Sequence, residues 1–164
     1  MMNARYLIML SLLPALTGCG VNSALPGGPP APVAQVDQMV VQAAPTAVNW
    51  DGRPGADGID LMVHFFLMAQ KQPVTVQGSI EFKLYEGALS AEKLQATPVF
   101  QEWRYAGNNL RSALQRTSFG WGYAFRLGWG SHVPQASAVT VVIQYAAPSG
   151  KTVTSDPVTI PMTQ

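Results

Sequence analysis

The clearest strand pattern in this chain is Phe119-Gly120-Trp121-Gly122-Tyr123-Ala124-Phe125-Arg126-Leu127-Gly128-Trp129. Its odd positions are all large and apolar, whereas its even positions are Gly, Gly, Ala, Arg and Gly. Alternation with a period of two is typical of a strand that buries one face. Because the opposite face carries few side chains, it lets a loop, a neighbouring chain or solvent approach the backbone closely.

Similar alternation recurs between short turns and predicts further strands at 59–67, 79–85, 98–105, 139–145 and 152–160. Both faces of 59–67 are apolar, so we expect this strand near the centre of a sheet. Pro157 and Pro161 lack backbone donors, which places the last strand at an edge. A further edge strand at 36–42 could dock on the same domain.

Helical patterns are confined to 90–95 and 108–115, the second with Asn108 as its N-cap. Roughly six or seven strands without a long helix predict an all-β fold, a single antiparallel β-sandwich of immunoglobulin-like or transthyretin-like type. We place this domain at 48–164, after a signal peptide and a Pro/Gly-rich tether. A domain of this size buries around two thirds of its unfolded surface and can fold alone.

The N-terminus begins with a weakly basic stretch at 1–5, followed by an apolar run at 6–16. This run is shorter than the about 20 residues that a transmembrane helix needs, so it is typical of a signal-peptide core. It ends in Leu16-Thr17-Gly18-Cys19, an aliphatic residue, two small residues and a Cys. All four positions match the lipobox, and this segment resembles bacterial lipoproteins. Residues 1–18 are therefore predicted to be a lipoprotein signal peptide.

This resemblance implies a specific processing of the chain. The Cys19 thiol would be alkylated by a diacylglyceryl group, the chain cut between Gly18 and Cys19, and the new amino group acylated. Two or three acyl chains, palmitate among them, would then hold the protein to a membrane, since two chains anchor stably whereas one binds reversibly. Gly20 stands where an Asp would favour the inner membrane, so we expect a lipid-anchored protein of the cell envelope, with the outer membrane favoured. The alternative is an ordinary signal or N-terminal helix with an incidental Cys.

Residues 19–47 are predicted to form the lipidated N-terminus and a tether rich in Pro, Gly and Ala. The sequence at 26–32 is Pro-Gly-Gly-Pro-Pro-Ala-Pro, which favours an extended, semi-rigid spacer. Beyond it, three stretches of the domain, at 55–61, 73–86 and 123–127, resemble uncharacterised lipoproteins of planctomycete-type bacteria. These stretches have the patterns of sandwich strands and carry no catalytic signature, so this second resemblance implies location and fold but no activity.

Composition excludes several classes of function. The chain has 10 Lys and Arg residues, 9 Asp and Glu residues and a formal net charge of +1. Removal of the signal peptide would take away Arg5 and leave a neutral protein. A protein with this balance of charges has too few excess basic residues to bind a phosphate backbone, so nucleic acid is not an expected partner. One Cys permits neither a disulfide framework nor a Cys-cluster metal site.

Motifs for cofactors and metals are weak. Gly150-Lys151-Thr152 lacks the Gly that a P-loop places five positions earlier, and it is expected in a hairpin rather than before a helix. Asp51, Asp57 and Asp60 could offer oxygen ligands to Ca²⁺, but their spacing matches no EF-hand and Asp-Gly turns explain the same residues. We therefore expect no cofactor and no metal.

The two His residues share no catalytic motif. Asp60 and His64 lie on one face of a strand about 13 Å apart, beyond hydrogen-bond reach. Ser131 and His132 are neighbours in a loop. An envelope hydrolase would require the fold to bring a His beside a carboxylate or a Ser. We expect a partly buried His64, a solvated His132 and no enzyme.

The four Trp residues leave a binding alternative open. Trp121 and Trp129 share the apolar face of their strand, which predicts core packing. Trp50 and Trp103 are more open, and an exposed indole ring is a platform on which sugars stack. The sequence thus predicts a membrane-anchored envelope protein whose sandwich has a structural role or binds another envelope protein. The alternative is a glycan-binding module that uses Trp50 and Trp103.

Overall fold

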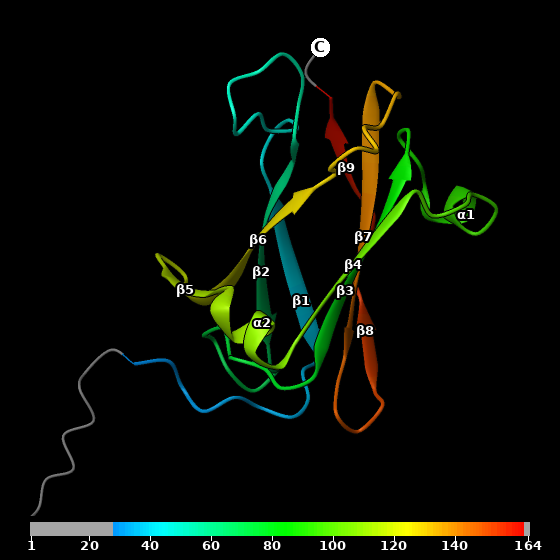
Figure 1. Ribbon diagram of the computed structural model, residues 1–164. Coiled ribbons are helices and arrows are strands. Elements are labelled where there is room, and N and C mark those ends of the chain that lie inside the picture. Colours follow the sequence, from blue (N-terminus) through cyan, green and yellow to red (C-terminus); the bar gives the residue numbers. More distant parts are fainter. Residues whose placement is uncertain (1–27, 163–164) are drawn as a thin grey trace, which may run out of the picture.

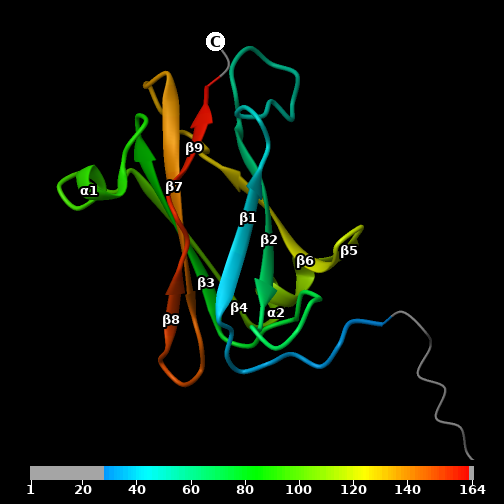
Figure 2. The same cartoon turned by 180° about the vertical axis from the view of Figure 1, so that it is seen from behind.

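The computed structural model describes residues 28–162, which form two antiparallel β-sheets packed face to face (Figure 1, Figure 2). The first sheet has four strands in the order β1 (Gln38–Ala43), β2 (Gly58–Phe66), β6 (Gly120–Gly128) and β5 (Leu114–Thr117). The second sheet has five strands. Four follow the order β4 (Gln101–Ala106), β3 (Ser79–Glu86), β7 (Ala138–Ala146) and β8 (Thr152–Thr154), and β9 (Val158–Pro161) also pairs with β7. The helices are α1 (Ala91–Leu94) and α2 (Gly107–Ser112). The all-β antiparallel sandwich predicted from the sequence is confirmed.

The alternating stretch at 119–129 forms β6, which lies beside β2 in the interior of the first sheet. The central position predicted for 59–67 is therefore confirmed. The apolar side of β6 faces the second sheet, where Tyr123, Phe125 and Leu127 are buried. Phe119 is 66% exposed because it lies in the turn before β6 begins.

The core is filled mainly by aromatic and β-branched side chains from both sheets. Phe82 of the second sheet contacts Phe125 of the first, with ring centroids 4.7 Å apart. The hydroxyls of two buried Tyr residues have backbone partners: that of Tyr123 accepts the N–H of Val76 at 2.8 Å, and that of Tyr145 donates to the carbonyl of Gln77 at 2.6 Å. Burial of each large apolar side chain contributes about 1.5–3 kcal/mol, so this interface is the main source of stability.

Two predicted elements differ from those observed. The helix predicted at 108–115 ends at Ser112, and β5 begins at Leu114. Its N-cap is Ala106 rather than Asn108, because Gly107, with φ of +54°, turns the chain directly out of β4. The strand predicted at 152–160 is divided into β8 and β9, both at the edge beside β7. Pro157, which cannot donate to the ladder, lies in the break between them.

The described part of the predicted tether is held on the sandwich. The possible strand at 36–42 is confirmed as β1, which pairs with β2 along its whole length. Val36 is 1% exposed, and Val33 forms a parallel bridge with Val76. The packed domain therefore includes residues from Val33 onward, in addition to those from 48 that the sequence assigns to it. Gly18, Cys19 and the predicted signal peptide lie outside the described residues.

The sandwich has two distinct ends, which Figure 1 shows at the bottom and the top of the molecule. Residues 28–37 reach the proximal end, which also carries the loop 67–78, α2 and the hairpin 147–151. The distal end carries the loops 44–57 and 129–137. Gly150 and Lys151 lie in the β7–β8 hairpin at the proximal end, so the predicted hairpin is confirmed.

Candidate functional site

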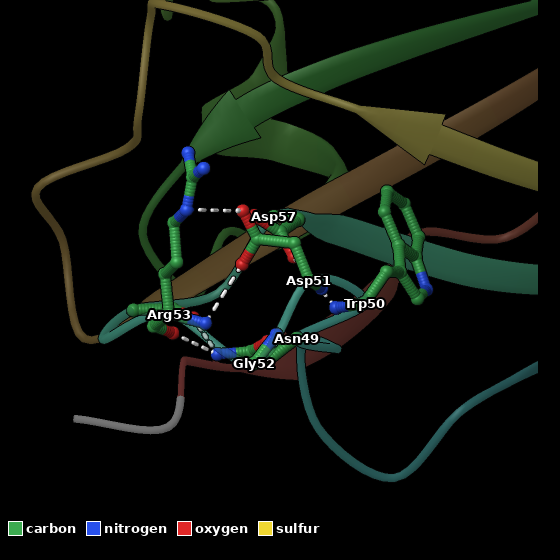
Figure 3. Close-up of polar contacts among 7 residues, drawn as sticks. Asn49, Trp50, Asp51, Gly52, Arg53 and Asp57 are labelled. Carbon is green, nitrogen blue, oxygen red and sulfur yellow. Dashed lines mark hydrogen bonds and ion pairs between the residues drawn. The ribbon is translucent and has the colours of Figure 1, made fainter.

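The β1–β2 loop at the distal end is organised around one carboxylate (Figure 3). Asp57 Oδ2 accepts the backbone N–H of Trp50 at 2.6 Å and that of Asp51 at 3.1 Å. These two N–H groups would otherwise point into solvent from a tight turn, and a carboxylate is a strong acceptor for them. Asp57 therefore fixes the start of the loop relative to its end.

Asn49 closes the same loop from the other side (Figure 3). Its Nδ2 donates to the carbonyls of Arg53 and Gly55, the latter at 2.7 Å, and its Oδ1 accepts the N–H of Gly52 at 2.7 Å. An Asn side chain that binds nearby backbone groups in this way is common in turns. Side chains of the loop thus bind several of its own backbone groups and hold its two ends together.

The Trp50 side chain packs on the outer face of the first sheet, over Gly58 of β2 and Gly128 of β6. A Cβ added to Gly58 would lie 2.4 Å from Trp50 Cη2, and one added to Gly128 would lie 3.4 Å from Trp50 Cζ3. The Arg126 guanidinium lies 4.8 Å from the centre of a Trp50 ring. Asp60 accepts the indole N–H at 3.4 Å and pairs with Arg126 at 3.6 Å. The close approach predicted for the small-residue face is confirmed, and Trp50 is what approaches at this end.

The Trp residues proposed for glycan stacking are both engaged within the protein. Arg126 covers one face of Trp50, and Trp103 is partly buried against the core. Trp129 is 2% exposed and donates its indole N–H to the carbonyl of Ala56 at 2.7 Å, which confirms its predicted core position. Trp121, for which core packing was also predicted, differs: it is half-buried near the start of β6 and is not among the core residues. The arrangement therefore gives the glycan alternative little support.

The three acidic residues considered for Ca²⁺ have other partners. Asp57 accepts the two backbone N–H groups described above, Asp60 pairs with Arg126, and Asp51 accepts the N–H of Arg53 at 2.8 Å. Across residues 28–162, no group of three His, Cys, Asp or Glu side chains is placed to hold a metal ion. The acidic loop is thus a hydrogen-bonded turn.

His64 lies on the outer face of the first sheet yet is 3% exposed. Its Nε2 lies 3.2 Å from Thr117 Oγ1, and its ring meets the Phe119 ring edge to face with centroids 6.2 Å apart. A Cβ added to Gly122 would lie 2.7 Å from His64 Nε2, so the bare face of β6 accommodates this ring as well. Burial lowers the pKa of His64. His64 is buried more completely than the partly buried position expected from the sequence, and Asp60 is bonded elsewhere.

Ser131 and His132 lie in the exposed loop 129–137, with Ser131 Oγ 3.3 Å from His132 Nδ1. In the part of the chain that the structure describes, neither side chain hydrogen-bonds to a carboxylate. Nucleophilic catalysis uses a base that a third group orients. Among residues 28–162, no contact places such an orienting group beside Ser131 and His132.

A depression of about 360 Å³ lies at the distal end between Trp50 and Trp129, and two others mark the surface elsewhere. One, of about 480 Å³, lies on the outer face of the first sheet over Ala124, between Met62 and Arg126. The other, of about 410 Å³, lies at the proximal end between the segment Pro29–Pro32 and α2, and its lining is mainly apolar. Neither holds a cluster of titratable groups, so both are better suited to contact than to chemistry.

Comparison with protein-family models, curated proteins and solved structures finds no match for this chain. Within residues 28–162, no helix is long and apolar enough to cross a membrane. The geometry of the described residues and the sequence motifs together are therefore the basis for assigning a function.

Proposed function

We propose that this chain is a lipid-anchored protein of the bacterial cell envelope whose sandwich binds another envelope protein and has no catalytic activity. The observation that carries the anchor is Leu16-Thr17-Gly18-Cys19 at the end of an apolar run. The first described residues support the same arrangement. They run along the proximal end, where Val33 donates its N–H to the carbonyl of Thr75 at 2.8 Å. The chain that leads back to Cys19 thus departs from one defined end.

The proposed binding site for the partner is the free edge of β4. This six-residue strand pairs only with β3 among the described residues, so its other edge offers unpaired backbone donors and acceptors. The remaining edges are less suitable. β5 and β9 have four residues each and β8 has three, and β1 contacts β8 and β9 across the sandwich. Addition of a partner strand to an exposed edge is a common mode of protein recognition.

Expression of wild type and Cys19→Ala in a bacterium that processes lipoproteins tests the anchor. We expect the wild type to begin at Cys19, to carry the mass of a diacylglyceryl group and to partition into detergent, because two or more acyl chains anchor stably. The Cys19→Ala protein should remain uncut and carry no lipid. Ser23→Ala changes the same segment outside the motif and should behave as wild type. A wild type that is cut elsewhere and stays in the aqueous phase would contradict the anchor.

A photoreactive side chain at Glu102, on β4, tests the proposed binding edge. The matched control is the same side chain at Gln38, which is exposed on the edge strand β1. We expect crosslinks to one envelope protein from position 102 that position 38 does not give. The purified partner should then bind the wild-type chain in solution. Equal crosslinking from both positions, or failure of the purified partner to bind, would reject this edge as the site.

A further inference from the structure

The proximal end exposes apolar side chains that a domain surrounded by water would be expected to cover. Met68, in the loop 67–78, is 92% exposed, and Phe119, in the β5–β6 turn, is 66% exposed. The two segments are adjacent, because a Cβ added to Gly120 would lie 3.0 Å from Pro73 Cδ. Figure 1 shows β5 on the side of the molecule from which residues 28–33 depart. The exposed apolar residues and the N-terminal segment therefore lie on one side.

The same end is basic. β5 and the β5–β6 turn also lie at this end, because they follow α2 and Gly120 approaches Pro73. Together the segments 28–37, 67–78, 107–120 and 147–151 contain one acidic residue, Asp37, and four cations that are all exposed: Lys71, Arg111, Arg116 and Lys151. Lys151 lies 3.5 Å from Asp37. Lys71, Arg111 and Arg116 form no ion pair with any residue in 28–162. The proximal end thus has a positive potential although the domain is neutral.

The N-terminal segment is short as well as fixed. Thr75 donates its hydroxyl to the carbonyl of Pro30 at 2.8 Å, and Gln77 donates its N–H to the carbonyl of Val33 at 2.8 Å. Only residues 19–27 separate Cys19 from the described chain, and nine residues can span at most about 30 Å. A lipid on Cys19 would therefore keep the proximal end within that distance of the bilayer.

We propose that the proximal end rests on the anionic phospholipid surface in which Cys19 is anchored. Met68 and Phe119 enter the interfacial region, and Lys71, Arg111, Arg116 and Lys151 face the lipid headgroups. Apolar side chains flanked by cations bind anionic bilayers by burial and by electrostatic attraction, which acts within a Debye length of the surface. The distal loop then points away from the membrane. This inference rests on the proposed lipid anchor.

A single fluorescent probe on each end tests this orientation. Lipidation would consume Cys19, so an added Cys would be the one free thiol of the mature chain. Ser149→Cys places it in the proximal hairpin, and the matched Ser131→Cys places it in the distal loop. Each full-length variant is produced in a lipoprotein-processing bacterium, labelled with an environment-sensitive dye and reconstituted into vesicles of phosphatidylglycerol and phosphatidylethanolamine. We expect the dye at position 149 to emit at shorter wavelength than at 131 and to be several-fold less accessible to aqueous acrylamide.

Two further changes test how much electrostatic attraction contributes to this orientation. Lys71→Gln with Arg116→Gln, or vesicles of phosphatidylcholine alone, should return the dye at position 149 to the accessibility seen at 131 while the chain stays on the vesicles. Equal quenching at both positions on a chain that carries the lipid and floats with the vesicles overturns the orientation and leaves the anchor intact. A chain that lacks the lipid mass and remains in the aqueous fraction overturns both.

Discussion

The two ends of the sandwich differ in whether their polar groups have partners within the protein. At the distal end, the cations are paired, Arg53 with Asp51 and Arg126 with Asp60. The backbone N–H groups of residues 50–53 are also bound by side chains of the same loop (Figure 3). At the proximal end, Lys71 is unpaired within the described residues and Met68 is almost fully exposed. A loop that satisfies itself is stable in water, whereas unpaired cations beside exposed apolar groups are typical of a contact surface.

The two ends also differ in what holds them. The distal end depends on a few specific side chains, Trp129 and Asp57 above all, which bind backbone atoms of the loop. At the proximal end, backbone hydrogen bonds between separate segments, such as Val33 with Thr75 and Gln77, add to side-chain bonds such as that of the Thr75 hydroxyl to Pro30. We therefore expect changes at exposed proximal side chains such as Met68 to cost less stability than changes at Trp129 or Asp57.

The largest expected effect is that of Trp129→Ala. This side chain is 2% exposed and donates to the carbonyl of Ala56 at 2.7 Å, so its removal leaves a cavity and an unpaired acceptor. We expect a loss of about 3–5 kcal/mol in the free energy of unfolding, measured by urea denaturation. Met68→Ala at the proximal end should change it by less than about 0.5 kcal/mol. Similar losses in both variants would remove the contrast between the ends.

A smaller effect is expected for Asp57→Ala. The backbone N–H groups of Trp50 and Asp51 lose their acceptor, and because the site is half-exposed, water replaces part of the bond. We expect a destabilisation of about 1–2 kcal/mol, comparable to the loss of a helix cap. Asp51→Ala is the control because it leaves the Asp57 acceptor in place. It removes an ion pair with Arg53 and a bond to the Arg53 N–H, both exposed to water, so we expect a loss of only about 0.5 kcal/mol. Amide exchange at residues 50 and 51 should rise only in Asp57→Ala, and a rise in both variants would contradict the role of Asp57.

The strands could be predicted because their pattern is local. Alternation at 119–129 and at 59–67 specifies which face is buried whatever the partner strand is, and both became central strands of the first sheet. β5 is absent from the predicted strands because Leu114 and Gln115 fall in the predicted helix 108–115, and the four residues become a strand only by pairing with β6. Its formation thus depends on a partner that the local sequence does not reveal.

The contacts of Trp50 illustrate the same limit at the level of the site. The glycines at 120, 122 and 128 predicted a close approach without identifying what approaches. Trp50 packs on this face because of the register between β2 and β6. That register sets Gly58 opposite Gly128 and Asp60 opposite Arg126. Strand register is a long-range property, so the packing of this ring could not be read from the sequence. Lipidation of Cys19 is predicted from a local motif, and the comparison of wild type with Cys19→Ala tests it.

The smallest expected effect concerns Asp37, at the proximal end. The Met68 N–H that it accepts at 3.0 Å lowers the pKa of this carboxyl; burial opposes the shift, and Lys151 adds to it. A carboxyl whose pKa is lower in the folded state stabilises the protein above its unfolded pKa and loses that contribution as pH falls through the folded value. Asp37→Asn should therefore melt slightly below wild type at neutral pH, and the gap should close below about pH 4. Thermal melts of both proteins across this range measure it. A gap that persists in acid would show that the carboxylate charge does not stabilise this junction, which would then depend on the other hydrogen bonds of the proximal end.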